Sequence, residues 1–125
     1  MSKLFLDGSF PNQRLILENQ HCAFVMTPQP VLQGSGLIVT KEVRETVFDL
    51  TPEAWTATYD LLQQVKTYLD GSLQPDGCNV GWNVRPVGGK SIPHVHLHII
   101  PRFKDEPLAG RGIRYHLKQP ENTRP

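Results

Sequence analysis

The stretch PHVHLHIIPR, residues 93–102, places three of the five histidines of this 125-residue chain at alternate positions. In an extended strand, alternate side chains point to the same face of a sheet. We therefore expect His94, His96 and His98 to share one face, with the intervening aliphatic side chains on the other. The flanking prolines and the β-branched content favour a strand over a helix, in which the three imidazoles would scatter around the axis. The histidine face is the first candidate for a functional site.

Length and composition predict one soluble globular domain, with 38% hydrophobic and 20% charged residues. Thirteen basic and twelve acidic side chains nearly cancel, so no general attraction for nucleic acid or for an anionic membrane is expected. No apolar run approaches the roughly 20 residues that a membrane span requires. The apolar part of the N-terminal segment is too short for a secretory signal, so the expected location is cytoplasmic.

Two cysteines are too few for a secreted disulfide scaffold. They also lack the short spacing of a zinc-binding pair. We expect both Cys22 and Cys78 to be small core residues, since unpaired cysteine is commonly buried.

Strands are expected over residues 14–18, 21–26, 37–40 and 78–84, in addition to the histidine stretch. Trp82 alternates with Val80 and Val84, which predicts that it packs in the core. The first two strands pivot at residues 19–20, and prolines and glycines exclude regular structure between the second and third. With one long helix in the middle of the chain, this order predicts an α+β domain with an antiparallel sheet.

The helix has clear boundary signals. Thr51 can cap its N-terminus, Pro52 suits the first helical position, and Gly71 is expected to end it. An apolar stripe at helical spacing predicts the face that packs on the sheet; it comprises Trp55, Thr58, Leu62, Val65 and Leu69.

A structural role is the first interpretation of the three histidines. Buried imidazoles need hydrogen-bond partners, and three adjacent rings would compete for the same acceptors. The cost of leaving such groups unsatisfied argues against this interpretation.

A metal site is the second interpretation, because His-x-His on a strand can bring two nitrogens to a zinc ion. The outer two histidines are about 13 Å apart at their α-carbons in an extended strand. No cysteine or carboxylate lies close by in the sequence to complete the shell. We therefore expect no resident metal, although a metal-dependent hydrolase that uses the three histidines stays open as an alternative.

Chemistry at phosphorus is the third interpretation. A neutral histidine is a nucleophile near its unperturbed pKa of about 6.5, and a protonated neighbour can stabilise phosphate charge or protonate a leaving group. The preceding loop, Gly88-Gly89-Lys90-Ser91, offers backbone amides for an anion-binding nest, an ammonium and a hydroxyl. Without the rest of the Walker spacing it is not a P-loop.

The segment HVHLHII, residues 94–100, matches completely the signature His-φ-His-φ-His-φ-φ of the histidine triad (HIT) family, in which φ is apolar. Upstream, NVGWNVRPVGGKSIP (79–93) resembles the Asn-rich strand and glycine-containing loop of that family. GSGLIVTK (34–41) stands where the family usually has Gly-His-x-φ-φ-φ-Pro-Lys. The similarity runs from about residue 15 to 102 of a single domain spanning 1–125, with 103–125 as a C-terminal extension.

The resemblance implies a HIT-like antiparallel half-barrel with one long helix, and a homodimer whose two subunits form one continuous sheet. It implies a nucleotide or dinucleotide as the substrate and no required cofactor, although a divalent metal ion can accompany the substrate phosphates. The ending IIPR (99–102) resembles the branch that hydrolyses dinucleoside polyphosphates more than the phosphoramidase branch.

The resemblance also implies a hydrolase or nucleotidyl transferase in which His96 attacks the α-phosphorus and forms a nucleotidyl-histidine intermediate that water then resolves. On this mapping His98 hydrogen-bonds the phosphate and assists the leaving group, and His94 fixes the orientation and tautomer of His96. The positions where the family contacts phosphates are Asn83, Gly89, Lys90 and Ser91.

Three departures from the family pattern bear on the nucleotide site. Ser35 stands where a fourth histidine usually supports the triad, and Thr27 where an Asp or Asn usually holds the ribose. Lys90 replaces a common Gln and adds a positive charge near the phosphates. A non-catalytic nucleotide-binding module of the same fold is therefore a further alternative.

The C-terminal extension carries an alternating apolar pattern at Ile113, Tyr115 and Leu117. This pattern predicts a segment docked on the sheet or on a partner subunit. If it docks near the triad, Arg111 or Arg114 would meet the substrate phosphates.

Overall fold

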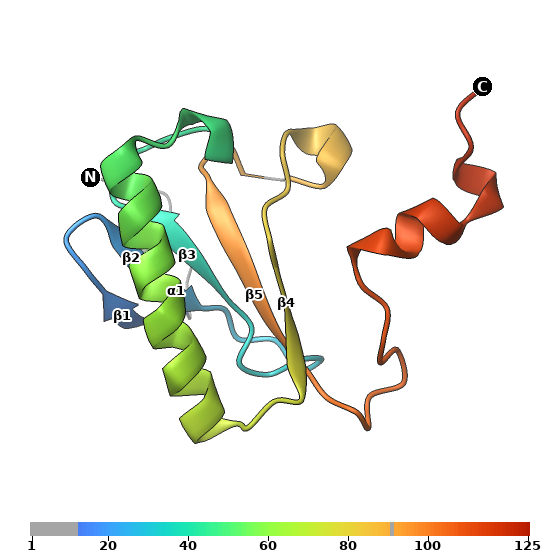
Figure 1. Cartoon of the computed structure of the whole chain (residues 1–125), viewed down its shortest axis with the longest axis horizontal. Coiled ribbons are helices and arrows are strands. Elements are labelled where there is room, and N and C mark those ends of the chain that lie inside the picture. The colour runs from blue at the N-terminus through green and yellow to red at the C-terminus, as the bar shows by residue number, and fades with distance from the viewer. Residues whose placement is uncertain (1–12, 91) are drawn as a thin grey trace.

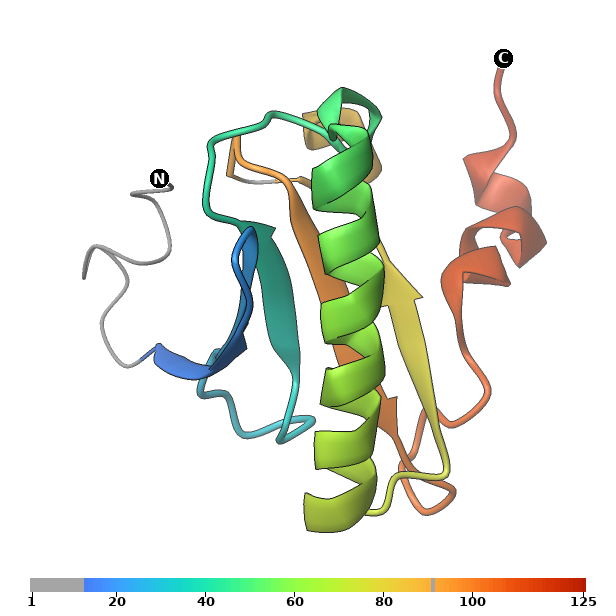
Figure 2. The ribbon, with the colours of Figure 1, turned by 60° about the vertical axis from the view of Figure 1, so that its left-hand side comes forward.

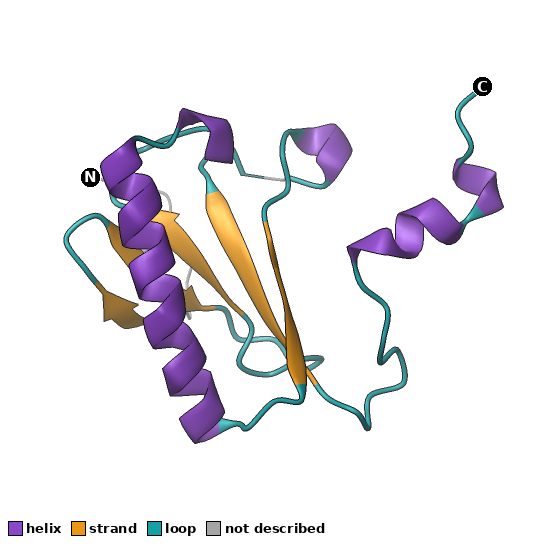
Figure 3. Cartoon of the chain, in the orientation of Figure 1, coloured by secondary structure: helices purple, strands orange, loops and turns teal. Residues whose placement is uncertain are grey.

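The computed structural model describes residues 13–90 and 92–125. Five strands and one long helix form the domain (Figure 1): β1 (Arg14–Glu18), β2 (Cys22–Met26), β3 (Gly36–Thr40), α1 (Pro52–Ser72), β4 (Gly77–Gly81) and β5 (His96–Arg102). Short 3₁₀ helices complete the described chain: η1 (Val47–Asp49), η2 (Pro86–Gly88), η3 (Ile113–Lys118) and η4 (Pro120–Asn122). Figure 3 shows them outside the sheet, in the connections and the C-terminal tail.

The five strands form one antiparallel sheet in the order β1-β2-β3-β5-β4. The helix α1 lies across one face of this sheet (Figure 2). The predicted α+β class, with an antiparallel sheet and a single long helix, is confirmed. The segment 82–95, which includes His94, connects β4 to β5. The topology therefore places this segment at the end of the sheet where β4 stops and β5 starts.

The alternation expected for the histidine strand is present. Leu97 and Ile99 are 1% and 2% exposed and belong to the core cluster that packs under α1. His96 and His98 face the other side of the sheet, because they are directly opposite Val39 and Leu37 of β3. The strand therefore anchors the domain with one face and presents two imidazoles with the other.

The strand β5 begins at His96, not at residue 94. The His94 amide donates to the Ile92 carbonyl in a turn (2.8 Å), and the Val95 amide donates to the Arg44 carbonyl (2.7 Å). The expectation that all three histidines belong to one regular strand is wrong. A contact from a distant loop diverts the chain before the sheet ladder starts.

The predicted strand over 78–84 ends earlier, at Gly81. Arg85 adopts φ +63°, which a regular strand does not accommodate, and η2 follows directly. Trp82 then lies beyond the strand, where it is partly buried against the core and stacks on Trp55 with ring centroids 5.7 Å apart.

Two expectations for α1 need correction. Gly71 does not end the helix, which runs to Ser72; the Gln74 amide donates to the Leu69 carbonyl, and Gln74 supplies the left-handed residue at φ +52°. The predicted Thr58, Val65 and Leu69 are buried, but Trp55 is 52% exposed, because the buried stripe passes through Ala54 at that turn. That stripe comprises Ala54, Ala57, Thr58, Leu61, Val65 and Leu69.

The two cysteines have different environments. Cys22 is fully buried on β2, and its thiol lies 3.4 Å from the Thr58 hydroxyl. Burial raises the pKa of the Cys22 thiol. Cys78 is exposed, so the expectation that it is a core residue is wrong. It lies on β4, an edge strand, where side chains have fewer neighbours.

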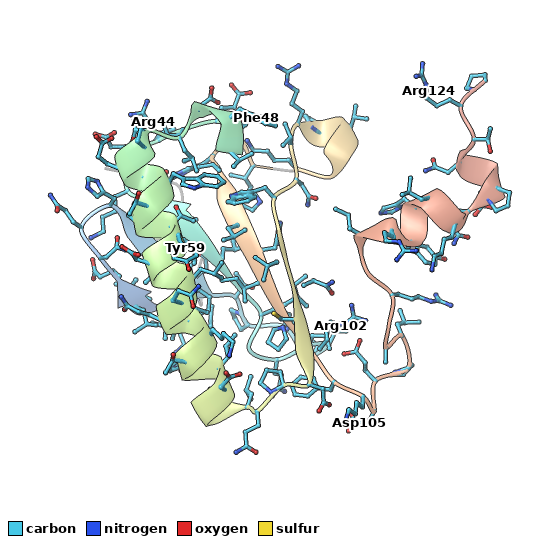
Figure 4. All side chains as sticks on the ribbon, in the orientation of Figure 1. Arg44, Phe48, Tyr59, Arg102, Asp105 and Arg124 are labelled. Atoms are coloured by element: carbon cyan, nitrogen blue, oxygen red, sulfur yellow. The ribbon has the colours of Figure 1, made fainter. Side chains whose placement is uncertain are left out.

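The start of the C-terminal tail is fixed by Arg102 at the end of β5 (Figure 4). Its guanidinium pairs with Glu106 (2.5 Å) and donates to the Asn79 side chain (2.5 Å). It also donates to the Leu108 and Arg111 carbonyls (2.7 and 2.6 Å). These bonds set the direction in which the tail leaves the sheet.

Beyond this anchor, the tail stands beside the β4 edge and away from the sheet (Figures 1 and 2). Ile113 and Leu117 are 80% and 85% exposed, and Tyr115 is 38% exposed. The expected docking of this segment on the sheet of its own chain is therefore wrong. Docking on a partner subunit stays a prediction.

Candidate active site at the start of β5

Two imidazoles form the centre of the site. The His96 and His98 rings meet edge to face, with centroids 5.0 Å apart and planes inclined by 72°. Val39 and Leu37 are their cross-strand partners on β3, so aliphatic side chains lie beside the two rings on this face. This arrangement places two nitrogen-bearing rings within reach of one small ligand group.

The tautomer of His96 follows from its main-chain contact. His96 Nδ1 lies 2.7 Å from the carbonyl oxygen of His94. A carbonyl can only accept, so Nδ1 carries the hydrogen and donates it. In the neutral ring the lone pair is then on Nε2, the nitrogen that can act as a nucleophile.

The His94 imidazole is fixed on β3. It is fully buried, and its Nε2 lies 3.0 Å from the Thr40 carbonyl and 3.3 Å from the Thr40 hydroxyl. Nε2 therefore donates to Thr40. The contact that orients His96 comes from the main chain of His94, while its ring holds this main chain in place through Thr40.

Both flanking histidines favour the neutral form. Burial is the largest cause that lowers the pKa of His94, and nearby charge at His96 and Lys90 lowers it further. Burial followed by charge at His96 lowers the pKa of His98. Near neutral pH both rings therefore act as neutral hydrogen-bond partners.

The amides of the glycine loop are already occupied. The Gly88 and Lys90 amides both donate to the Arg85 carbonyl (3.1 Å each), and the Gly89 amide donates to the Pro86 carbonyl (2.9 Å). These three amides therefore do not form the expected anion-binding nest in this turn, and the Ser91 amide lies outside the described residues. The loop instead folds into a closed turn that fixes the position of Lys90.

The Lys90 side chain is buried, with 7% of the residue exposed. Its ammonium has no hydrogen-bond partner in the part of the chain that the structure describes. Ser91, the next expected phosphate contact, lies outside the described residues. A buried ammonium is costly unless an anion or an acceptor meets it.

Asn83 and Gly89 lie together on the exposed side of the same loop. Gly89 has φ +107°, and a Cβ placed on it would lie 3.4 Å from the Asn83 amide group. Glycine is required here because other residues rarely adopt this conformation. The turn thus gathers Asn83, Gly89 and Lys90 beside the start of β5.

Thr27 and Ser35 are not brought to this loop. They flank the β3 end that begins at Gly36, whereas His94 binds Thr40 at the other end, about 13 Å along the strand. The Ser35 hydroxyl donates to the Leu32 carbonyl (2.7 Å). Thr27 lines a cavity of about 400 Å³ with side chains from the end of α1.

The tail arginines line a separate cavity of about 510 Å³ beside β4, which includes Asn79, Arg111 and Arg114. The Arg111 guanidinium also lies over the Tyr115 ring, 5.1 Å from its centroid. Figure 4 shows the tail continuing to Arg124, away from the sheet. The contact of these arginines with substrate phosphates stays a prediction.

Thr40 is a residue of the candidate site that the sequence did not indicate. Its partner His94 is 54 positions away, and no local pattern indicates that contact.

Among residues 13–90 and 92–125, no group of three His, Cys, Asp or Glu side chains could hold a metal ion. No described helix is long and apolar enough to cross a membrane.

Comparison with known proteins places this geometry in context. The family model described as "HIT domain" matches residues 11–105. An asymmetrical bis(5′-nucleosyl)-tetraphosphatase of Schizosaccharomyces pombe is 27% identical over 105 residues, covering 83% of this chain and 58% of the relative. The chain thus spans little more than half the length of that relative.

Two further relatives cover more of their own length. An uncharacterized HIT-like protein of Mycoplasma genitalium is 26% identical over 114 residues, covering 91% of this chain and 77% of the relative. The crystal structure of a HIT family protein from Bacillus anthracis superposes with a TM-score of 0.72 at 25% identity, covering 82% of this chain and 72% of that structure.

Proposed function

The chain belongs to the HIT domain family, and from this premise we propose that it is a nucleotide hydrolase or nucleotidyl transferase with His96 as its nucleophile. The observation that carries the proposal is the bond from His96 Nδ1 to the His94 carbonyl (2.7 Å). It leaves the lone pair of the neutral ring on Nε2, on the sheet face opposite α1.

In the proposed first step, the Nε2 lone pair forms a bond to the α-phosphorus of the substrate. The bond from this phosphorus to the leaving group breaks, and its electron pair departs with the leaving group. The ring becomes positively charged, and its Nδ1 hydrogen stays shared with the His94 carbonyl, which stabilises that charge. Water then attacks phosphorus, breaks the P–N bond and releases a nucleoside monophosphate and a proton.

The flanking histidines have supporting roles in this proposal. His98 is 5.0 Å from His96 by ring centroids and would donate a hydrogen bond to the phosphate. His94 would act as a positioning residue, because its ring binds Thr40 and its carbonyl binds His96. Both have lowered pKa values, which supports hydrogen bonding rather than strong acid catalysis.

The proposed substrate is a nucleotide of the dinucleoside polyphosphate class. The similarity to the fission-yeast tetraphosphatase supports this class. We propose that the phosphates meet Asn83, Lys90 and Ser91 through their side chains, and Gly89 through its amide, whose bond to the Pro86 carbonyl would open. Ser35 and Thr27 would contact the nucleoside side of the substrate only if their present loop contacts rearrange.

A nucleotide-binding module without turnover is the second candidate. It is favoured by the Ser35 hydroxyl, which is engaged with Leu32 and replaces the fourth histidine that the family pattern leads us to expect. Tight nucleotide binding without product would support this candidate. Activity that a chelator removes and zinc restores would instead support the metal-dependent alternative.

We further propose a homodimer. β4 has one neighbour, β5, within the described chain, so its outer edge can pair with another strand. Val80 on β4 is 46% exposed, and Trp82, which follows β4 directly, stacks on the half-exposed Trp55. A second copy would cover these apolar groups. Light scattering should give twice the chain mass, and Val80→Lys with Trp55→Glu should give a monomer.

The proposed compartment is the cytoplasm, where the two unpaired cysteines, Cys22 and Cys78, would stay reduced. No cofactor is proposed beyond a divalent ion carried by the substrate phosphates.

Incubation with diadenosine tetraphosphate tests the catalytic proposal. The parent protein should release AMP, and His96→Asn should lower kcat by at least about 1,000-fold, as expected when a covalent nucleophile is lost. Thr67→Ala, on the exposed surface of α1, is the matched control. A His96→Asn variant as active as the control would exclude His96 as the nucleophile.

A further inference from the structure

The buried ammonium of Lys90 is the polar group in the described site that most needs a ligand. The residue is 7% exposed, and its Nζ atom has no hydrogen-bond partner among residues 13–90 and 92–125. Burying a positive charge without an acceptor is unfavourable, because the ammonium loses its hydrogen bonds to water and gains none in the protein. An anion that enters the site would meet this group and remove the deficit.

Within residues 88–90, the turn that carries Lys90 holds it in place without offering a free backbone amide to an anion. Its amide is bound to the Arg85 carbonyl, and the Gly88 and Gly89 amides are used within the same turn. The short helix η2, which precedes Lys90, lies at the end of the sheet where β5 starts (Figure 1), so the turn brings Lys90 to the flank of the site. Among residues 88–90, the Lys90 side chain is therefore the group left to recognise an anion.

We propose that Lys90 is a specificity-determining residue whose ammonium binds an anionic leaving group, so that the site selects phosphoanhydrides over phosphoramidates. This inference rests on the proposed function and deepens it, because it names the substrate bond. A phosphoanhydride releases a phosphate or a nucleotide, both of which are negatively charged. A phosphoramidate releases an amine.

Proton balance supports the same choice. When Nε2 of His96 attacks a phosphoanhydride, the P–O electron pair departs on a phosphate oxygen, which is stable as an anion without a proton. An amine leaving group must take up a proton as the P–N bond breaks. His94 and His98 both have lowered pKa values, so neither ring is a ready proton source near neutral pH. A fixed ammonium stabilises the first kind of leaving group and not the second.

The activity test compares kcat/KM for diadenosine tetraphosphate and for adenosine 5′-phosphoramidate in the parent protein, Lys90→Gln and Lys90→Met. We expect the ratio of the two values to favour the anhydride in the parent. In both variants it should fall by about 10- to 100-fold, the range of a charge-assisted hydrogen bond in a desolvated site. Lys66→Gln is the matched control, because Lys66 is exposed on α1 and paired with Asp70 (2.7 Å); its ratio should equal that of the parent.

Either of two results would overturn the inference. The ratio would stay within threefold of the parent value if Lys90 acted equally on both substrates through the α-phosphate. A parent protein that prefers the phosphoramidate would contradict it directly.

A binding test separates this inference from the catalytic proposal. In the His96→Asn background, ATP carries a potential leaving group and AMP does not. We expect ATP to bind more tightly than AMP, and Lys90→Met to reduce that advantage by at least about tenfold. If neither the parent protein nor any variant releases AMP, the catalytic proposal fails, while this binding measurement still decides the role of Lys90. An ATP-to-AMP affinity ratio that Lys90→Met leaves unchanged would refute it.

Lys90→Met should also fold, because it removes a buried charge and keeps the aliphatic stem. Its urea midpoint without ligand should equal or exceed that of the parent. A midpoint well below the parent value would show that Lys90 has a structural partner in the free protein, contrary to the inference.

Discussion

Leu97→Ala tests whether β5 anchors the domain with one face while it presents the imidazoles with the other. Leu97 is 1% exposed and lies in the core cluster with Phe24 and Leu61. Removing a fully buried leucine to alanine costs about 2–5 kcal/mol, because transfer free energy is lost and a cavity remains. With a urea m-value of about 2 kcal/mol/M, a loss of 3 kcal/mol lowers the unfolding midpoint by roughly 1.5 M.

The unfolding of Leu97→Ala can be followed by fluorescence, since Trp82 packs against the core. Val87→Ala is the control: Val87 is fully exposed on η2, and its loss should change the free energy of unfolding by less than about 0.5 kcal/mol. Where Leu97→Ala is folded, its kcat should stay within threefold of the parent, because the side chain points away from His96. A loss below about 1 kcal/mol, or a folded variant without activity, would refute the proposed division between the two faces.

Three further predictions concern pH, packing and thiol access. Because burial lowers the pKa of His94 in the folded protein, the histidine of the unfolded chain takes up a proton at higher pH. The free energy of unfolding should therefore be at its full value above about pH 6.5 and should fall below that pH by up to about 1.4 kcal/mol per pH unit. Urea midpoints at pH 7.5 and 5.5 measure this fall, and equal midpoints would contradict it. Gly36→Ala should destabilise the fold by about 1–3 kcal/mol in urea, because its Cβ would lie 2.6 Å from the Val25 carbonyl, and an unchanged midpoint would count against this register. A thiol reagent should modify Cys78 within minutes and Cys22 only on unfolding, and two fast equivalents would be the wrong result.

The parts of the fold that sequence predicted are those with a local period. Alternation in the histidine stretch predicted that Leu97 and Ile99 would be buried opposite His96. The proline and threonine at its start predicted where α1 begins, and Thr51 does accept the Ala54 amide (3.1 Å). These signals depend on neighbours within one or two turns, so tertiary contacts did not alter them.

The errors arose where a distant contact decides. Trp55 fits the helical spacing, yet it is half exposed and stacks on Trp82, which is 27 positions away in the sequence. His94 fits the strand pattern, yet Thr40 and the Arg44 carbonyl hold this segment outside the ladder. The two residues of each contact are far apart in the sequence, so no local pattern indicates that they meet.

The candidate site divides in the same way. The spacing of the histidines and the resemblance to the family predict that the triad and the loop belong to one site. The occupied amides of the loop and the buried ammonium of Lys90 were not, because both depend on the closed turn at Arg85. That turn requires a positive φ at a non-glycine residue, which sequence patterns do not indicate.

Chemical trapping of the bond between phosphorus and the nucleophile is the most direct measurement of all. The protein would be mixed with diadenosine tetraphosphate, denatured within milliseconds at alkaline pH, digested and analysed by mass spectrometry. The account predicts one adenylyl group on the peptide that contains His96, formed at least as fast as AMP is released and absent from His96→Asn. Rapid AMP release with no adduct on that peptide would contradict it.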